Sequence, residues 1–447
     1  MLTLVAVAVL AGGTSFYSRA TSRGTDFNVF YLGGHLVTEA PEELYKQASN
    51  RGSNYTYLNP PFFAILMWPL AALPIGASAV AWFVVNVVCT GHSAWILSRL
   101  LAPPGLTAAF LAMILLLALP YTLENIFLGQ VHAVILYLMV LSFAAIRRRR
   151  GAIVGAAGVA MATAIKLLPA IFGVYFLIRR EWRAFASFVL LLAVTTVAVP
   201  AMFLGPRTAF ALLGEFYQLQ VGPYVSGEST QHAIYARTAI RKTQHDQDLG
   251  ALLMRHFTAE HGTRGLLLAR VNLRVVRSAM FGLFAVILAI SVATAWPRAG
   301  DRVTEPRMTD LVFAVFVMLS LLLSPRNRMA YWTVLMIPWA VLLGRLMDGR
   351  TPTRSRRLAG FTLGVSAISC VLVEVAIFRT LSIGFWGQAT LWSGLIAMCH
   401  EERRAARLTS DLASGVPSRR PRTPRAGAVL EPASHAANKH SESRAEN

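Results

Sequence analysis

The segment GTDFNVFYLGGHLVTEAPEELYKQASNRGSNYTYLNPPFFAILMWP, residues 24–69, decides how the chain is organised. It places a carboxylate, Asp26, together with tyrosines and amides between two apolar segments, and returns to apolar sequence at Pro60 and Pro61. Such a polar, aromatic segment is either a connector between membrane helices or the wall of a site at the membrane surface. The sequence on both sides is needed to decide between these interpretations.

The rest of the chain is too apolar for a single soluble core. Of the 447 residues, 55% are hydrophobic and 14% are charged, whereas about 25% of the residues of a typical soluble domain are charged. Apolar stretches long enough to cross a hydrocarbon layer of about 30 Å recur along the chain. No internal repeat is visible, so the inverted symmetry of many transporters is not expected. The sequence predicts an all-α polytopic membrane protein with about twelve transmembrane helices and no large soluble domain.

The net charge of +20 has two interpretations, nucleic-acid binding or retention of basic loops on the cytoplasmic side. We favour the second, because the basic residues occupy short loops between apolar segments, with Arg147–Arg150 as the strongest example. Both termini are then cytoplasmic, and the protein lies in the inner cell membrane. The cysteines Cys89, Cys370 and Cys399 lie in or beside apolar segments, in a pattern that indicates neither disulfides nor zinc.

The expected organisation is one multi-spanning domain, residues 1–400, followed by a disordered basic cytoplasmic tail, residues 401–447. Residues 17–79 form the first outer loop, with a helix at the interface where prolines interrupt the apolar run Pro60–Leu73. Residues 205–271 form a large outer loop. A short polar hinge is expected at Glu124 and Asn125, between two spans.

The stretch Ala152–Ile178 is too long for one ordinary span and too short for two. Lys166 lies near its middle, and both ends are basic. We favour a break near Lys166, so that two short helices meet at this lysine on the outer side. A single tilted helix with a snorkelling lysine is the alternative.

This topology gathers acids, bases and aromatic residues on the non-cytoplasmic side. A transporter places its ionisable groups along a pathway near the midplane of the bilayer, whereas here they lie at the outer rim. The pattern favours a site where the membrane meets water. A lipid or sugar transporter (or flippase) and a non-catalytic subunit of an assembly complex remain open.

Several motifs resemble those of glycosyltransferase family 87. The run DFNVFYLGGHLVTEAPEELY, residues 26–45, followed by YLNPPFF, residues 57–63, is similar to the N-terminal signature of that family. GQVH, residues 129–132, resembles a Gly-Gln-hydrophobic-Asn motif, and Lys166 with Pro169 resembles a Lys-x-x-Pro region. LSP, residues 323–325, resembles a late Ser-Pro loop.

The resemblance implies a GT-C-type, inverting membrane glycosyltransferase that takes its sugar from a polyprenyl phosphate and transfers it to a hydroxyl of a glycolipid or lipoglycan. Mannose is the first candidate sugar, and arabinofuranose from decaprenyl phosphate is the alternative. Two positions depart from the family pattern. His132 stands where the family usually has Asn, and Ala330 precedes Tyr331 where the family often has His. The role of that histidine is either unfilled or taken by His132, His232 or Arg326.

Transfer of a sugar from a lipid phosphate needs a base for the acceptor hydroxyl and cations for the leaving phosphate. Asp26 is the candidate base, although an N-cap for a helix beginning near Phe27 is the simpler role for an aspartate there. Lys166 is the first candidate for the phosphate, with Arg326 and Arg237 behind it; lipid headgroup binding is the alternative for Arg326. No Asp-x-Asp pair lies on the outer loops, so neither a metal nor another cofactor is indicated. The remaining candidates for binding the donor are Tyr57, Asn59, Glu124, Gln130, His132 and His232, each of which also has a structural alternative as a turn residue, a helix cap or a hydrogen-bonding group.

Overall fold

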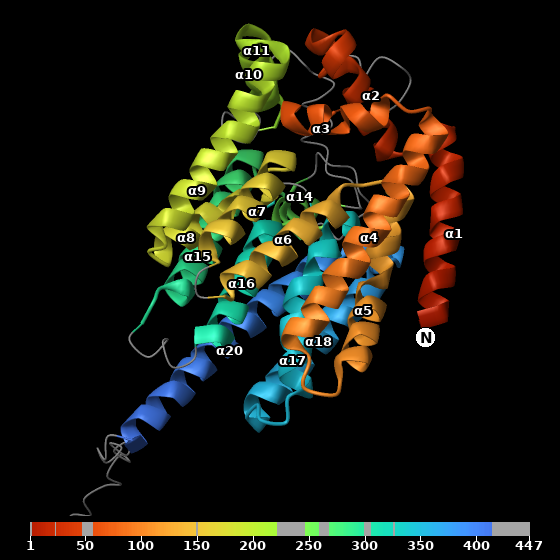
Figure 1. Ribbon diagram of the computed structural model, residues 1–447. Helices are drawn as coiled ribbons and strands as arrows, with labels where there is room; N and C mark the ends of the chain where they lie inside the picture. The colour runs from red at the N-terminus through yellow and green to blue at the C-terminus, as the bar shows by residue number, and fades with distance from the viewer. Residues whose placement is uncertain are drawn as a thin grey trace, which may run out of the picture.

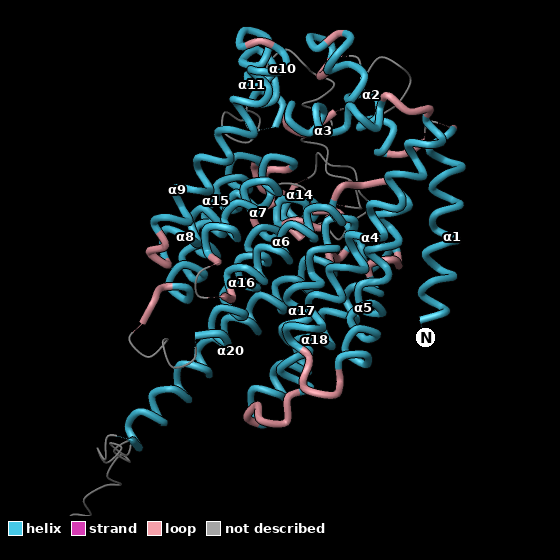
Figure 2. The backbone as a smooth tube through the Cα atoms, in the orientation of Figure 1, coloured by secondary structure: helices cyan, strands magenta, loops and turns pink. Residues whose placement is uncertain are grey.

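The computed structural model describes residues 2–22, 24–46, 57–148, 151–220, 246–258, 268–298, 305–324 and 327–413. Among these residues all regular secondary structure is helical, and the helices pack into one elongated bundle (Figures 1 and 2). This confirms the predicted all-α class.

The N-terminal half builds one end of the bundle. Helix α1 runs along its side, and α2 and α3 pack together across the top, next to the upper ends of α4 and α5 (Figure 1). The elements are α1 Leu2–Thr21, α2 Asp26–Glu39, η1 Pro41–Glu43, α3 Pro61–Ala71, α4 Ile75–Leu101, α5 Thr107–Leu128, α6 His132–Ile146, α7 Ala152–Ile165, η3 Leu168–Ile171, α8 Phe172–Ile178, α9 Trp182–Ala193, η4 Val194–Ala198, α10 Val199–Leu204 and α11 Pro206–Gln220.

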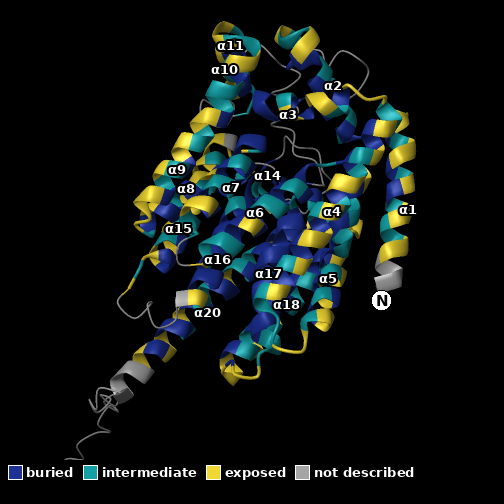
Figure 3. Ribbon diagram, viewed as in Figure 1, coloured by how far each residue is buried: buried dark blue, intermediate teal, exposed yellow. Residues whose placement is uncertain are grey.

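The C-terminal half supplies the centre of the bundle. Helices α16 and α17 are almost fully buried, and α20 packs on α16 and α18 before it extends away from the other helices (Figures 1 and 3). The elements are α14 Leu249–Phe257, α15 Leu273–Ala295, α16 Glu305–Leu322, η6 Met329–Leu335, α17 Met336–Met347, α18 Thr353–Leu372, α19 Ala376–Thr380 and α20 Ile383–Ala413.

Five helical stretches in the described part of the chain are long and apolar enough to cross a membrane. Two of them, 182–204 and 274–295, lie at the periphery and leave large apolar side chains uncovered, such as Met202 and Val275, which are 86% and 57% exposed. In water such surfaces would be costly, whereas lipid tails cover them at no such cost. The stretches are 75–101, 107–128, 182–204, 274–295 and 329–347.

The polar hinge expected at Glu124 and Asn125 is wrong. Helix α5 continues through both residues and ends at Leu128, because Gly129 adopts a left-handed conformation with φ 65° and stops the helix. The Asn125 side chain is satisfied inside the bundle, where it donates to Asn86 Oδ1 of α4 at 2.7 Å. A buried pair of amide side chains, Asn125 and Asn86, therefore takes the place of the solvated turn that the polar residues predicted.

The expected break at Lys166 is present. Helix α7 ends at Ile165, Lys166 is extended with φ −155° and ψ 130°, and the chain continues as the short helices η3 and α8. Pro169 favours this interruption because it has no backbone N–H to donate to a continuing helix. The break places Lys166 at the end of a helix, where its side chain leaves the bundle axis.

The far end of the bundle is held by ion pairs. Arg147 pairs with Asp310 at 3.0 Å, and Arg345 of α17 pairs with Glu402 of α20 at 2.6 Å, with both of the latter side chains less than 10% exposed. The pair ties α20, which runs from Ile383 to Ala413, to α17.

Candidate active site

Asp26 is the first residue of α2, and its carboxylate is not a helix cap. The residue that precedes the helix is Thr25, whose backbone N–H and hydroxyl both donate to Asn28 Oδ1, at 3.0 and 2.7 Å. The Asn28 amide donates in turn to the carbonyl of Ala20 at 2.7 Å, which ties the start of α2 to the end of α1. Asp26 Oδ2 instead accepts a hydrogen bond from the Gln130 side chain.

The turn between α5 and α6 carries this partner, and Gly129 gives the turn its shape. A Cβ atom at Gly129 would lie 2.6 Å from the Phe16 ring and 2.6 Å from the Cβ of Phe27, so only glycine allows this close approach. The Gly129 carbonyl accepts from Trp82 Nε1 at 2.9 Å, which fixes the turn against α4. The result is that Gln130 points at Asp26.

A second chain of hydrogen bonds fixes the next residues of the turn. Asn86 of α4 donates to the carbonyl of Trp82 at 2.9 Å and accepts from Asn125 at 2.7 Å. Asn125 Oδ1 accepts from the backbone N–H of His132 at 3.1 Å. The start of α6 is thus anchored by buried amides of two neighbouring helices.

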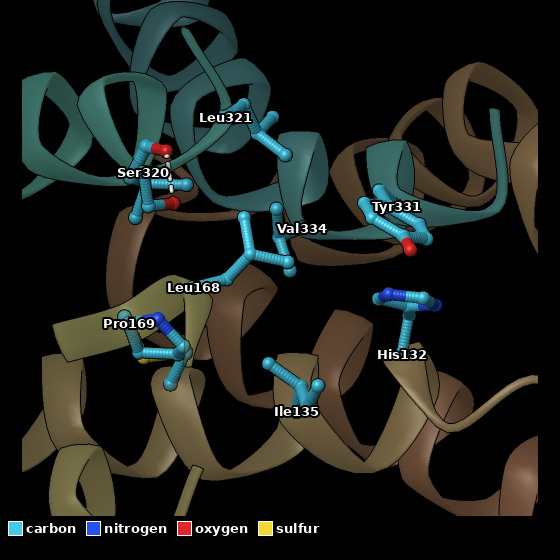
Figure 4. Close-up of a pocket in the computed structure, with 10 residues that line it drawn as sticks. His132, Ile135, Leu168, Pro169, Ser320, Leu321, Tyr331 and Val334 are labelled. Carbon is cyan, nitrogen blue, oxygen red and sulfur yellow. Dashed lines mark hydrogen bonds between the residues drawn. The ribbon is translucent and has the colours of Figure 1, made fainter. Parts of the chain in front are cut away.

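His132, Lys166 and Tyr331 form a compact cluster at this end of the bundle. Lys166 Nζ lies 3.1 Å from His132 Nε2 and 3.9 Å from the centre of the Tyr331 ring. The rings of His132 and Tyr331 face each other with centroids 4.2 Å apart (Figure 4). When the ammonium group of Lys166 donates, Nε2 accepts, so the imidazole is neutral with its proton on Nδ1. The lysine is held between an imidazole nitrogen and an aromatic face.

Arg328 brings another cation from the segment before η6. Its Nε lies 3.1 Å from Asp246 Oδ1. Asp246 lies just before α14, and the next residue, Gln247, donates its backbone N–H to the Asn327 carbonyl at 2.7 Å. The side chain of Asn327 is itself fixed by Trp332 and Gln388, at 2.6 and 2.7 Å. The segment that precedes α14 and the segment that precedes η6 therefore meet beside the cluster.

These charges act on Asp26. Burial raises the pKa of the Asp26 carboxyl above its usual range, and the Gln130 hydrogen bond and the charges of Arg328, Lys166 and Arg19 oppose that rise. A carboxyl group whose pKa is raised toward neutral pH is better matched to general-base work than an exposed one. The surroundings of Asp26 therefore suit proton transfer.

A pocket opens next to the cluster. His132 and Tyr331 line its polar end, and the other side chains that line it are mostly apolar and come from α6, η3, α16 and η6 (Figure 4). The polar end of this lining lies at the cluster, because Lys166 Nζ is 3.1 Å from His132 Nε2. The apolar lining consists of Ile135, Met139, Leu168, Pro169, Val317, Leu321 and Val334.

The other predicted site residues have different positions. Tyr57 is 1% exposed, donates to the Pro60 carbonyl at 3.3 Å and packs on Gly33, while Asn59 accepts through its carbonyl from Tyr45 at 2.9 Å. Both belong to the packing around α2 and α3. Glu124 is half-buried on α5, close enough to Asp26 for the two charges to interact. His232, Arg237 and Arg326 lie outside the residues that the structure describes.

Three neighbours of Asp26 or Lys166 were not among the predicted site residues: Arg19, Arg328 and Tyr331. Arg19 and Arg328 lie in segments next to the motifs, so proximity in sequence to Asp26 and to the Ser-Pro loop was the available signal. Of the residues considered for the missing histidine role, His132 is the one in the described part of the chain. Its imidazole packs on Tyr331, beside the position of Ala330.

No group of three or more His, Cys, Asp or Glu side chains that could hold a metal ion occurs in the described ranges. The groups brought together here are the Asp26 carboxylate, the Gln130 amide, the His132 imidazole and the cations Lys166 and Arg328. Their chemistry suits hydrogen bonding to sugar hydroxyls and charge pairing with a phosphate.

Comparison with known proteins identifies relatives over part of the chain. It is 33% identical over 162 residues to a "Polyprenol-phosphate-mannose-dependent alpha-(1-2)-phosphatidylinositol mannoside mannosyltransferase" of Mycobacterium tuberculosis, covering 33% of this chain and 37% of that protein. A "Polyprenol-phosphate-mannose-dependent alpha-(1-2)-phosphatidylinositol pentamannoside mannosyltransferase" of Mycolicibacterium smegmatis is 33% identical over 167 residues, covering 35% of this chain and 38% of that protein. A Mycobacterium tuberculosis protein of the same description is 29% identical over 238 residues, covering 50% of this chain and 52% of that protein.

The chain thus matches between about a third and a half of the length of these curated relatives. No solved structure matches it. The model of glycosyltransferase family 87 matches residues 57–325, more than half of the chain. This span includes the turn that carries Gln130 and His132, the break at Lys166, and Asp246. The chain therefore belongs to glycosyltransferase family 87.

Proposed function

We propose that the protein transfers mannose from a polyprenyl-phosphate donor to a hydroxyl of a glycolipid or lipoglycan. The observation that carries this proposal is the convergence of Asp26, Lys166 and an apolar pocket at one end of a helical bundle. The names of the mannosyltransferase relatives support mannose over the arabinofuranose alternative. The membrane-crossing helices support a donor carried on a lipid.

The reaction that we propose is a single displacement with inversion. The acceptor oxygen attacks the anomeric carbon while Asp26 accepts the hydroxyl proton. The bond between that carbon and the phosphate oxygen breaks, and its electron pair stays on the phosphate. Lys166 stabilises the growing negative charge, and we place the start of the lipid chain against the apolar side chains next to it.

Gln130 fixes the orientation of the base. It donates to one oxygen of Asp26, which leaves the other carboxylate oxygen for the acceptor hydroxyl. His132 and Tyr331 fix Lys166 from two sides, so that the ammonium group is in place before the donor arrives.

We further propose a topology that fits this chemistry. In it, about twelve spans cross the membrane, α2 and α3 lie at the non-cytoplasmic interface, and both termini are cytoplasmic. Asp26 and Lys166 lie at one end of the bundle, and the arginines Arg147 and Arg345 lie at the other end. This separation supports the orientation. The donor, a lipid with its phosphate at the surface, then reaches the site from the outer leaflet.

The test is transfer by membranes that contain the full chain. They are given radiolabelled polyprenyl-phosphate mannose and a phosphatidylinositol mannoside acceptor, and the labelled glycolipid is measured. Asp26→Asn, which keeps the size of the side chain but cannot accept the proton, should reduce the rate by at least about 100-fold. The exposed residue Gln218 on α11 provides the control Gln218→Leu, which should transfer normally.

Other outcomes separate the alternatives. Transfer of arabinofuranose but not mannose would exclude the proposed donor. If the labelled lipid crossed the membrane of sealed vesicles and no labelled glycolipid formed, the protein would be a transporter. Full activity of Asp26→Asn at normal expression would exclude Asp26 as the base.

A further inference from the structure

Arg328 and Asp246 are not used by the reaction as described above, yet they lie beside it. Arg328 precedes η6, and its charge acts on both Asp26 and Tyr331. Lys166 Nζ lies 3.9 Å from the centre of the ring of this same tyrosine. Arg328 lies in the same turn as Tyr331, whose backbone N–H donates to the Arg328 carbonyl at 2.8 Å.

The guanidinium of Arg328 is only partly engaged. Its Nε pairs with Asp246, and within the described ranges no residue is bonded by its two terminal nitrogens. The arginine side chain is 38% exposed, whereas the Asp246 side chain is 1% exposed. A buried carboxylate thus holds one edge of the guanidinium and leaves the open edge available.

Docking of the outer loop does not depend on this ion pair alone. Arg255 of α14 donates to the carbonyl of Arg379 at 2.9 Å and to Ser382 Oγ at 2.7 Å, and its other terminal nitrogen bonds the Asp246 carbonyl. Gln247 adds bonds to the carbonyls of Arg379 and Asn327, at 3.1 and 2.7 Å. The loop would stay docked without Arg328, so a purely structural role does not explain an arginine with an open edge here.

We propose that Arg328 binds the phosphate of the lipid donor opposite Lys166, and that Asp246 is the positioning residue that orients it. This inference rests on the proposed function and deepens it. Two parallel N–H groups on the open edge of a guanidinium match two phosphate oxygens. The large outer loop then contributes to the donor site through Asp246.

The charges of the site support this assignment. The donor is a phosphodiester with one negative charge, and the product is a phosphate monoester with a charge of about −1.5 to −2 at pH 7. A second cation stabilises the products and the transition state more than the substrate. Arg328 pairs with Asp246 at 3.1 Å, whereas Asp26 accepts its hydrogen bond from Gln130.

Binding of undecaprenyl phosphate to the purified full chain in lipid nanodiscs tests this proposal. Undecaprenol is the matched ligand, since it has the same hydrocarbon chain without the phosphate. Arg328→Gln should weaken binding of the phosphate about 10- to 100-fold and leave binding of undecaprenol unchanged. Asp246→Asn should weaken it about 3- to 10-fold, because the arginine keeps its charge and loses its orientation.

The double variant Asp246→Asn/Arg328→Gln decides between positioning and independent effects. If Asp246 acts through Arg328, the double variant binds the phosphate no more weakly than Arg328→Gln alone. It also removes the charge that Arg328→Gln leaves buried, so it provides a folded protein where the single variant does not fold. Asp348→Asn is the matched control, since Asp348 forms an ion pair with Arg307, 3.4 Å apart, outside the site.

Undiminished binding of undecaprenyl phosphate by folded Arg328→Gln, or by the double variant, would overturn the proposal. An equal loss of undecaprenol binding would also overturn it, because the effect would then not concern the phosphate. The proposed function fails separately: the wild-type chain would then bind the lipid phosphate through Arg328 but transfer no mannose.

Discussion

Gln130→Leu is expected to move the pH dependence of transfer. Leucine has a similar volume and cannot donate to the Asp26 carboxylate. Burial already raises the pKa of the Asp26 carboxyl, and the Gln130 hydrogen bond is the largest influence that opposes this rise. Its loss favours the protonated form of Asp26, which cannot act as a base.

The size of the effect follows from the hydrogen bond. A hydrogen bond to a charged group contributes about 1.5–3 kcal/mol, and 1.36 kcal/mol corresponds to one pKa unit. Because Asp26 is not fully buried, we expect the lower part of this range. The midpoint of the acid limb should therefore rise by about one pH unit, and the rate on that limb should fall about tenfold at a given pH.

The assay is the transfer rate in membranes from pH 4 to 9 at saturating donor, for the wild type, Gln130→Leu and the control Gln218→Leu. Activity is lost as the pH falls, because Asp26 becomes protonated, and Gln130→Leu loses it at a higher pH than the wild type. An acid limb at the same pH in Gln130→Leu and the wild type, or one displaced to lower pH, would refute the role of this hydrogen bond.

Three further predictions concern the supports of the site and of the fold. Gly129→Ala should lower the free energy of unfolding by about 2–4 kcal/mol, measured by thermal unfolding in detergent, because φ is 65° and the new Cβ would lie 2.6 Å from the Phe16 ring and from the Cβ of Phe27; an unchanged melting temperature would contradict it. Tyr331→Leu should raise KM for the donor about 3- to 10-fold by removing the aromatic face under Lys166, whereas Tyr331→Phe should keep it; equal effects of both would point to the hydroxyl instead. Glu402→Gln should cost about 3–5 kcal/mol because Arg345 loses its buried partner, and unaltered stability would show that this pair does not hold α20.

The sequence by itself determined the class of the protein and much of its outline. The 55% hydrophobic composition and the spacing of the apolar stretches require helices in a membrane, because hydrocarbon cannot satisfy unpaired backbone groups. Lys166 and Pro169 within an apolar run were enough to predict a helix break. The motifs around Asp26 and Gln130 were enough to indicate the family.

Only the tertiary structure decided which residues meet. Asp26 and Gln130 are separated by 104 positions, and Arg328 and Asp246 by 82, so no local pattern brings them together. Polar residue types alone also gave a wrong prediction. Asn125 was predicted to belong to a solvated hinge, but it is buried within α5, because Asn86 of α4 is its hydrogen-bond partner. Whether a polar side chain marks a loop, a packing contact or a site depends on that partner, and partners from distant segments are set by how the helices pack.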